Sequence, residues 1–514
     1  MTRAYQILTL LFVLASILLV ILAIPRGFDF TDEGLYVLLA DPKQQNVGGI
    51  FNYDLFFKLI HRFTGFEFGI IGLRIIRFLS YFLGAWALTR FWQNLYLSGK
   101  IFRPVFILVL AGLMAGYSFL PPSLSYNSIS VVGACFWLAI LSKPKPRSWD
   151  FLSLGIVLLF LFYSKATFCI LVTIVSLIYF WDKKMLNIRT LSLILIPFLL
   201  IETFCFFIFE TNAILRILAT DSFVFLRVDY SFPLLLKYTG VGIFWSLIPG
   251  LLFFLAGLIS RKKSQLRIPS LLMAVASIPL VFYFTWITSE WNHAFLLILC
   301  ALLGWKVAQG NIYCLDRKKQ FFFILLLLLP FAMHFGSNVY WLRLGIHYAV
   351  FWVLAIQLLN KETSVSSFSQ FHLATTMSIF VLIGFGIWIM PFEGTSLELA
   401  TEEWEYKTGK KIKLNSVQVN MLSTLRDELD DIGEGEIAAF YRNPGILYLL
   451  DYRSPFIPGY WTADQARHYL KEGNELSVIL ENDLGAFPFD STNWVLKQEL
   501  SQPNGERLRV LWKK

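Results

Sequence analysis

The chain has 514 residues, of which 56% are hydrophobic and only 15% are charged, and its mean hydropathy is +0.61. Soluble domains carry about 25% charged residues, so this composition excludes an ordinary soluble protein and predicts a multi-pass integral membrane protein. The net charge of +9 does not indicate a nucleic-acid partner, because lysine and arginine form short clusters between apolar runs.

Apolar stretches of about 17 to 25 residues, the length of a helix that crosses a bilayer, recur throughout residues 1–391. The first, Ile7 to Ile24, is too long and too uniformly apolar for a signal-peptide core and lacks a small-residue cleavage site, so we expect it to be the first span. About thirteen spans are predicted, near residues 7–24, 77–97, 104–120, 126–141, 149–163, 166–181, 191–209, 235–258, 269–287, 293–308, 320–333, 344–359 and 373–391.

The distribution of basic residues predicts the orientation of these spans, because lysine and arginine accumulate in cytoplasmic loops. With the N-terminus inside, the inner loops carry the basic clusters at residues 90–103, 143–147, 183–189, 261–267 and 317–319. An odd number of spans then puts the tail outside the cytoplasm. The chain is compact and lacks long eukaryotic-type loops, so we expect a bacterial inner membrane and a periplasmic tail.

The first long segment between predicted spans is Pro25 to Ile76. Its second half, Tyr53 to Phe63, places Lys58, His61 and Arg62 at i, i+3 and i+4 opposite apolar side chains. This periodicity is typical of a helix that lies in the membrane surface.

Asp32 and Glu33 lie a few residues beyond the outer end of the first span, where a bilayer-embedded site would meet water. An adjacent like charge and partial burial raise the pKa of one carboxyl group, which suits a general base. Two simpler interpretations involve no catalysis: an ordinary solvated loop acid, or an N-cap in which Asp32 opens a helix through Leu35 to Leu39.

A set of cations on the same predicted face suits a phosphate or pyrophosphate group, which arginine binds bidentately. The candidates for substrate binding are Lys58, Arg62, Arg74, Arg77, Lys165, Arg343 and His347. Snorkelling toward anionic headgroups is the alternative for Lys58 and Arg62, whereas Arg77 and Lys165 interrupt otherwise apolar sequence.

A metal site has little support in the sequence. Glu290 and His293, at i and i+3, could coordinate a divalent metal ion, although a hydrogen-bonded loop end is the simpler interpretation. The five cysteines lie in or beside apolar segments, so the tail has no disulfide framework or zinc-ligand spacing. The sequence has no P-loop, dinucleotide fingerprint, nucleophile elbow or CxxC motif. It therefore identifies no cofactor, and a divalent metal ion is the one candidate.

The composition changes abruptly at residue 392, after which Glu, Asp, Asn and Gly become frequent. We predict helices near 417–429 and 462–472 and strands near 437–441 and 447–450. The predicted fold is therefore a polytopic α-helical membrane domain, residues 1–391, followed by a small extracytoplasmic α/β domain, residues 392–514.

The order of these features resembles the C-type glycosyltransferase superfamily, which includes aminoarabinose transferases and protein O-mannosyltransferases. The motifs that carry the resemblance are Thr31–Tyr36, Arg77–Ser80, Tyr163–Thr167 and Ile446–Asp451. The resemblance implies transfer of a sugar from a polyprenyl-phosphate-linked donor to a lipid, protein or glycan acceptor. It further implies that Asp32 is the catalytic base, Glu33 its partner, and Arg77 and Lys165 contacts to the lipid-linked phosphate.

One departure from the family pattern concerns the next outer loop. Many relatives carry a second acidic motif there, whereas Pro121–Asn127 contains no acid, which leaves metal use and acceptor positioning open. Direct displacement of the lipid phosphate predicts inversion at the anomeric carbon.

Three other classes of protein remain compatible with the sequence. A transporter or flippase also has many spans, but its polar residues would concentrate near the midplane instead of at one face. Glycan polymerases and ligases typically place their long loop late in the chain. A membrane scaffold whose tail binds a partner needs no catalytic residues.

Overall fold

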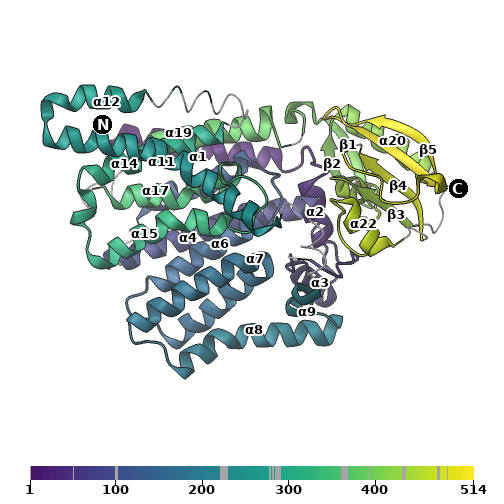
Figure 1. Cartoon of the computed structure of the whole chain (residues 1–514), viewed down its shortest axis with the longest axis horizontal. Coiled ribbons are helices and arrows are strands. Elements are labelled where there is room, and N and C mark those ends of the chain that lie inside the picture. The colour runs from purple at the N-terminus through teal and green to yellow at the C-terminus, as the bar shows by residue number, and fades with distance from the viewer. Residues whose placement is uncertain are drawn as a thin grey trace.

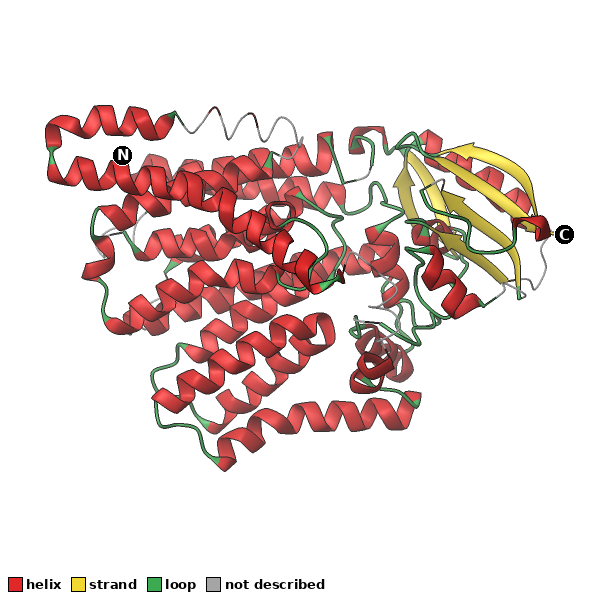
Figure 2. Ribbon diagram, viewed as in Figure 1, coloured by secondary structure: helices red, strands yellow, loops and turns green. Residues whose placement is uncertain are grey.

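The computed structural model describes the chain except for residues 1, 50, 99–101, 220–229, 277–278, 280–282, 284–290, 361–367, 393, 431–435, 472–474 and 483. Helices form an elongated bundle, and a small domain that contains a sheet lies against one end of it (Figures 1 and 2). Short helices of the first loop lie between the bundle and this domain (Figure 1).

The bundle consists of helices of very different lengths. They are α1 (Thr2–Ala23), α4 (Gly69–Tyr96), α5 (Arg103–Met114), α6 (Tyr126–Leu141), α7 (Ser148–Asp182), α8 (Ile188–Phe209), α11 (Phe232–Lys262), α12 (Arg267–Val275), α14 (Asn292–Ala308), α15 (Arg317–His334), α16 (Trp341–Leu344), α17 (Ala349–Leu358) and α19 (Gln370–Ile383). The short helices beside the small domain are α2 (Asp32–Ala40), α3 (Asp54–Thr64) and α9 (Ala213–Ala219).

Seven helical segments among the described residues are long and apolar enough to cross a membrane, which confirms the predicted membrane character. They are residues 3–23, 69–96, 148–182, 188–209, 232–262, 341–358 and 370–389. Shorter apolar helices occur at residues 103–118, 126–141 and 292–308. The expected count of about thirteen spans is not confirmed.

Helix α7 folds back on itself at Lys165. Its 35 residues would extend for about 52 Å in a straight helix. Instead, the backbone of Lys165 is non-helical, with φ −153° and ψ 84°. The rings of Phe151 and Phe180 lie 5.2 Å apart, and Cys169 Sγ lies 3.2 Å from the Leu158 carbonyl oxygen. The two halves are therefore antiparallel, as the separately predicted spans 149–163 and 166–181 require.

The basic loops gather at the end of the bundle that is remote from the sheet domain (Figure 1). Lys318 Nζ donates hydrogen bonds to the carbonyl oxygens of Asn94, at 3.1 Å, and Ser142, at 2.8 Å. Lys319 Nζ lies 4.3 Å from the ring centroid of Tyr96. Three loops with basic clusters thus meet at one end.

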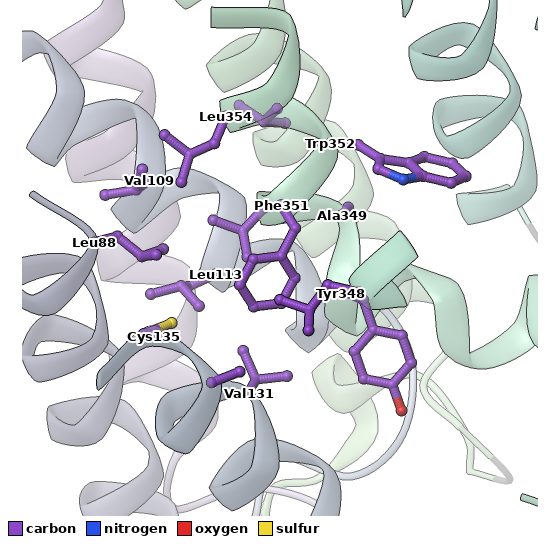
Figure 3. Close-up of a cluster of buried hydrophobic side chains, with 14 of the residues drawn as sticks. Leu88, Val109, Leu113, Val131, Cys135, Tyr348, Ala349, Phe351, Trp352 and Leu354 are labelled. Atoms are coloured by element: carbon purple, nitrogen blue, oxygen red, sulfur yellow. The ribbon is translucent and has the colours of Figure 1, made fainter. Parts of the chain in front are cut away.

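The core of the bundle joins helices that are far apart in the sequence. Figure 3 shows Leu88 of α4, Leu113 of α5, Cys135 of α6 and Phe351 of α17 in one apolar cluster, and all four are fully buried. Tight packing of this kind is what holds helices together in lipid, where the hydrophobic effect does not drive one helix onto another.

The tail contains a β-hairpin and a four-stranded sheet. The hairpin pairs β1 (Glu402–Lys407) with β2 (Lys410–Leu414). The sheet has the order β3-β4-β6-β5 and consists of β3 (Glu436–Phe440), β4 (Leu476–Asn482), β5 (Trp494–Ser501) and β6 (Arg507–Lys513). Strands β3 and β4 are parallel, and the other neighbours are antiparallel.

The predicted helices of the tail are present as α20 (Ser416–Leu429) and α22 (Ala463–Leu470), and the strand predicted near 437–441 is β3. The strand predicted at 447–450 is wrong, because residues 447–449 belong to α21 (Pro444–Leu449) and Leu450 is its C-cap. Proline at the first helical position favours this helix, since its fixed φ suits a helix start.

The tail shares one apolar core with the first loop. Phe30, Leu39 and Ile70 belong to the same buried cluster as Leu422 and Val510. A hydrogen bond connects the hairpin to α21: Trp404 Nε1 donates to the Leu449 carbonyl oxygen at 2.8 Å. The predicted boundary at residue 392 is therefore a boundary of composition but not of the core.

Candidate functional site

Asp29 organises the start of α2, the helix that carries the acidic pair. Its carboxylate accepts hydrogen bonds from the backbone N–H groups of Thr31 and Glu33, both at 3.0 Å, and from the Thr31 hydroxyl at 2.8 Å. These bonds satisfy donors that a helix start leaves unpaired. Asp32 is the first residue of α2, so the acidic pair does begin the predicted helix, but the N-cap residue is Thr31 and not Asp32.

Glu33 is a buried partner of Arg74. The Glu33 carboxylate accepts two hydrogen bonds from the Arg74 guanidinium, at 2.9 and 2.8 Å, and one from the Ser123 hydroxyl. The remaining Arg74 donors bind backbone carbonyl oxygens between Ala23 and Gly27. This pair joins the end of α1, the start of α2 and helix α4, a structural role that competes with the predicted roles in catalysis and substrate binding.

Gly34 gives the acidic motif its close contact with the tail. A Cβ atom at Gly34 would overlap the backbone nitrogen and Cα of Gly445 at the start of α21. The Gly445 N–H donates to the Phe30 carbonyl oxygen at 2.8 Å. The motif Thr31–Tyr36 and the tail motif Ile446–Asp451, which are remote in the sequence, therefore border the same contact.

Asp32 faces a cavity of about 220 Å³ that is lined by both parts of the protein. Arg343, which was predicted to bind substrate, lines the same cavity from helix α16. Arg442 and Trp461 line it from the tail, and Tyr126 lines it from the start of α6. Asp32 is partly buried, whereas both arginines are exposed. The cavity therefore combines one carboxylate with two guanidinium groups.

Sequence reasoning missed Arg442. It follows the last residues of β3, and its backbone and that of Tyr441 have positive φ, 74° and 56°. Such angles are uncommon outside glycine and often mark functional sites. Its position at the carboxyl end of a parallel strand, where ligands bind in many α/β sheets, was the available signal once β3 had been predicted.

Arg77 is fully buried within the bundle and does not line the Asp32 cavity. Its guanidinium donates to the carbonyl oxygens of Pro121 and Gly116 and lies 4.2 Å from the ring centroid of Tyr117. His347, which was also predicted to bind substrate, is buried beside Gly116 and has no hydrogen bond to the described residues.

Lys165 is buried and does not line the Asp32 cavity, although it lies near Tyr126, which does. Its Nζ donates to the Ser337 hydroxyl at 2.9 Å and lies 5.8 Å from the ring centroid of Tyr126. Tyr126 lines the cavity that Asp32 faces, whereas Lys165 does not.

Lys58 and Arg62 belong to a different cavity, which also includes Arg216. Of the two predicted metal ligands, Glu290 lies outside the described residues and His293 is buried at the start of α14. Within the described part of the chain, no group of three or more His, Cys, Asp or Glu side chains could hold a metal ion.

The electrostatics of the site are dominated by burial near Asp32. Burial and the neighbouring Asp32 carboxylate raise the pKa of Asp29 well above its ordinary value, despite the hydrogen bonds from Thr31 and Glu33. Burial and the charge of Asp32 also raise the pKa of Tyr36, which lines the cavity and remains a neutral phenol.

No family model, curated protein or solved structure matches this chain.

Proposed function

We propose that the protein is a membrane glycosyltransferase that moves a hexosyl or pentosyl group from a polyprenyl-phosphate-linked donor to an acceptor at the outer face of the membrane. The observation that carries the proposal is that Asp32 shares one cavity with Arg343 and Arg442. A carboxylate can accept the proton of an acceptor hydroxyl, while guanidinium groups can bind the phosphate that leaves.

The proposed reaction is a direct displacement. Asp32 takes the proton as the acceptor oxygen attacks the anomeric carbon from the side opposite the phosphate. The bond between the anomeric carbon and the phosphate oxygen breaks, its electron pair leaves with the lipid phosphate, and the configuration inverts. Arg343 and Arg442 stabilise the charge that develops on the phosphate.

The distribution of charge supports an outer location for this chemistry. The basic loops lie at the end of the bundle that is remote from the cavity (Figure 1), and such loops are cytoplasmic in most membrane proteins. A lipid-linked donor presents its phosphate at the level of the headgroups, so the site needs no domain for a soluble nucleotide sugar.

Transfer from radiolabelled polyprenyl-phosphate sugars by the purified protein in lipid nanodiscs tests the proposal. Asp32→Asn should lower the rate of transfer by about 100-fold or more, the usual contribution of a general base. Asp182→Asn, at an exposed aspartate beyond the Asp32 cavity, is the matched control and should keep full activity. Full activity of Asp32→Asn would reject the assignment, and movement of the intact donor across the bilayer of proteoliposomes without transfer would favour a flippase.

A further inference from the structure

A second cavity, of about 630 Å³, lies beside α3 and is distinctly basic. The cations that line it are Lys43 of the loop after α2, Lys58 and Arg62 of α3, and Arg216 of α9, and His61 lies among them. None of the described residues that line this cavity is acidic. The first loop and a segment about 150 residues further along the chain thus build one concentration of positive charge.

The buried carboxylate of Asp54 offsets part of this charge. It binds Lys58 at 2.9 Å and Arg216 at 2.7 Å, and both Asp54 and Arg216 are buried. These ion pairs fix the inner wall of the cavity. Lys43 and Arg62 are exposed and form no ion pair with any described residue, so a net positive charge faces the open space.

The cavity lies at the end of α8, a helix that is long and apolar enough to cross a membrane. Phe209, the last residue of α8, is part of its lining. Helix α3 packs on the same end of α8, where the rings of Phe63 and Phe204 are stacked with centroids 5.8 Å apart. Ile60 and Phe63 of α3 are exposed beside the cations. An exposed apolar strip next to basic side chains is typical of a helix at the level of lipid headgroups.

A thin wall separates this cavity from the one that contains Asp32. Asn46 contributes to the lining of both cavities. The wall is anchored to the tail, because Gln44 donates to the Ser454 carbonyl oxygen at 2.6 Å and accepts from the Ser454 N–H at 3.0 Å. The two cavities are therefore neighbours, but their charged side chains are different.

We propose that the basic cavity binds the phosphate group of a membrane-lipid headgroup, at a site separate from the Asp32 cavity. Several cations around one space suit a phosphate monoester, which carries up to two negative charges, and the position at the end of α8 favours a lipid over a soluble anion. The inference concerns binding alone, so it stands or fails independently of glycosyl transfer.

Equilibrium binding of a short-chain phosphatidic acid to the purified full-length protein in detergent tests this site. The double variant Lys43→Gln/Arg62→Gln removes the two exposed cations and leaves the buried Asp54 ion pairs intact. We expect it to bind phosphatidic acid about 10-fold more weakly than the wild-type protein does. The matched control, Lys411→Gln/Lys497→Gln, changes the same charge at positions in β2 and β5 and should bind as the wild type does.

Two further probes identify the ligand. The wild-type protein should bind phosphatidylcholine of the same chain length, and inorganic phosphate, at least about 10-fold more weakly than phosphatidic acid. Equal affinity for inorganic phosphate would overturn the lipid assignment, and unchanged affinity in Lys43→Gln/Arg62→Gln would overturn the site itself. Loss of transfer in Asp32→Asn with unchanged binding of phosphatidic acid would leave this inference intact.

Discussion

Gly34 of helix α2 and Gly445 of helix α21 are in backbone contact, and neither position has room for a side chain. A Cβ at Gly34 would overlap Gly445, and a Cβ at Gly445 would lie 2.7 Å from a ring carbon of Phe28. The contact fixes the distance between the helix that carries Asp32 and the tail segment that supplies Arg442. The width of the Asp32 cavity therefore depends on two glycines that have no side chain to take part in the proposed reaction.

Gly34→Ala should loosen the docking of the tail. The added methyl group meets backbone atoms, which cannot rotate away, so we expect a loss of about 1–3 kcal/mol of stability. Thermal unfolding in detergent and the rate of proteolysis within residues 402–513 measure this effect. Gly240→Ala is the control, because a Cβ there meets nothing within 4 Å. Equal stability of the two variants would contradict the proposed tight contact.

Glu33→Gln tests whether Glu33 stabilises the fold or takes part in the reaction. The substitution leaves the buried Arg74 guanidinium without its carboxylate, and breaking such a pair costs about 3–5 kcal/mol. We expect a marked fall in the midpoint of thermal unfolding, whereas Asp32→Asn should change it little because Asp32 is only partly buried. If Glu33→Gln were as stable as the wild type but inactive, Glu33 would act in the reaction itself.

Asp29 should make stability depend on pH. Burial and the Asp32 charge raise the pKa of Asp29 in the folded protein above its ordinary value of 3.8. At a pH between these two pKa values, the folded protein holds a proton on Asp29 that the unfolded chain has lost. This contribution to stability is complete below the unfolded pKa and disappears as pH rises through the raised folded pKa. Unfolding midpoints measured from acidic to neutral pH should show this fall.

The same titration has an internal test. Asp32→Asn removes one cause of the raised pKa of Asp29, so the fall in stability should move to lower pH. Asp29→Asn should abolish this component of the pH dependence. A fall that occurs at the same pH in the wild type and in both variants would assign it to another group.

Arg442→Gln should weaken the use of the donor if the tail contributes to phosphate binding. Hydrogen bonds to charged groups contribute about 1.5–3 kcal/mol, which corresponds to about a 10- to 100-fold loss in kcat/KM. Arg507→Gln, at an exposed arginine of β6, is the matched control and should be neutral. Unchanged kinetics in Arg442→Gln would remove the tail from the proposed chemistry.

The sequence predicts helices well where the chain has a strong period or a clear interruption. Lys58, His61 and Arg62 repeat with helical spacing, and the predicted helix 53–63 differs from α3 by one residue at each end. Lys165 interrupts an apolar run, and the chain turns there. Leu447–Leu450 carries neither signal, and a short apolar run of this kind fits a strand and a buried helix equally well.

The site is harder to predict than the helices, because residues of the same type have different partners in the fold. Arg74 and Arg343 were both candidates for substrate binding, yet Arg74 is enclosed by Glu33 and backbone carbonyl groups while Arg343 lines the cavity. Arg442 reaches the cavity only because α21 docks on α2 through Gly34. Contacts between segments about 400 residues apart leave no local pattern in the chain.

The shared core also limits how the protein can be divided for experiments. Trp404, Leu422 and Val478 would lose the apolar side chains of residues 28–73 if the tail were expressed alone. A fragment that began at residue 392 would expose an apolar surface, and proteins with such surfaces tend to aggregate. A soluble version of the tail will therefore need the first loop fused to it, so that both parts of the shared apolar core are present in one protein.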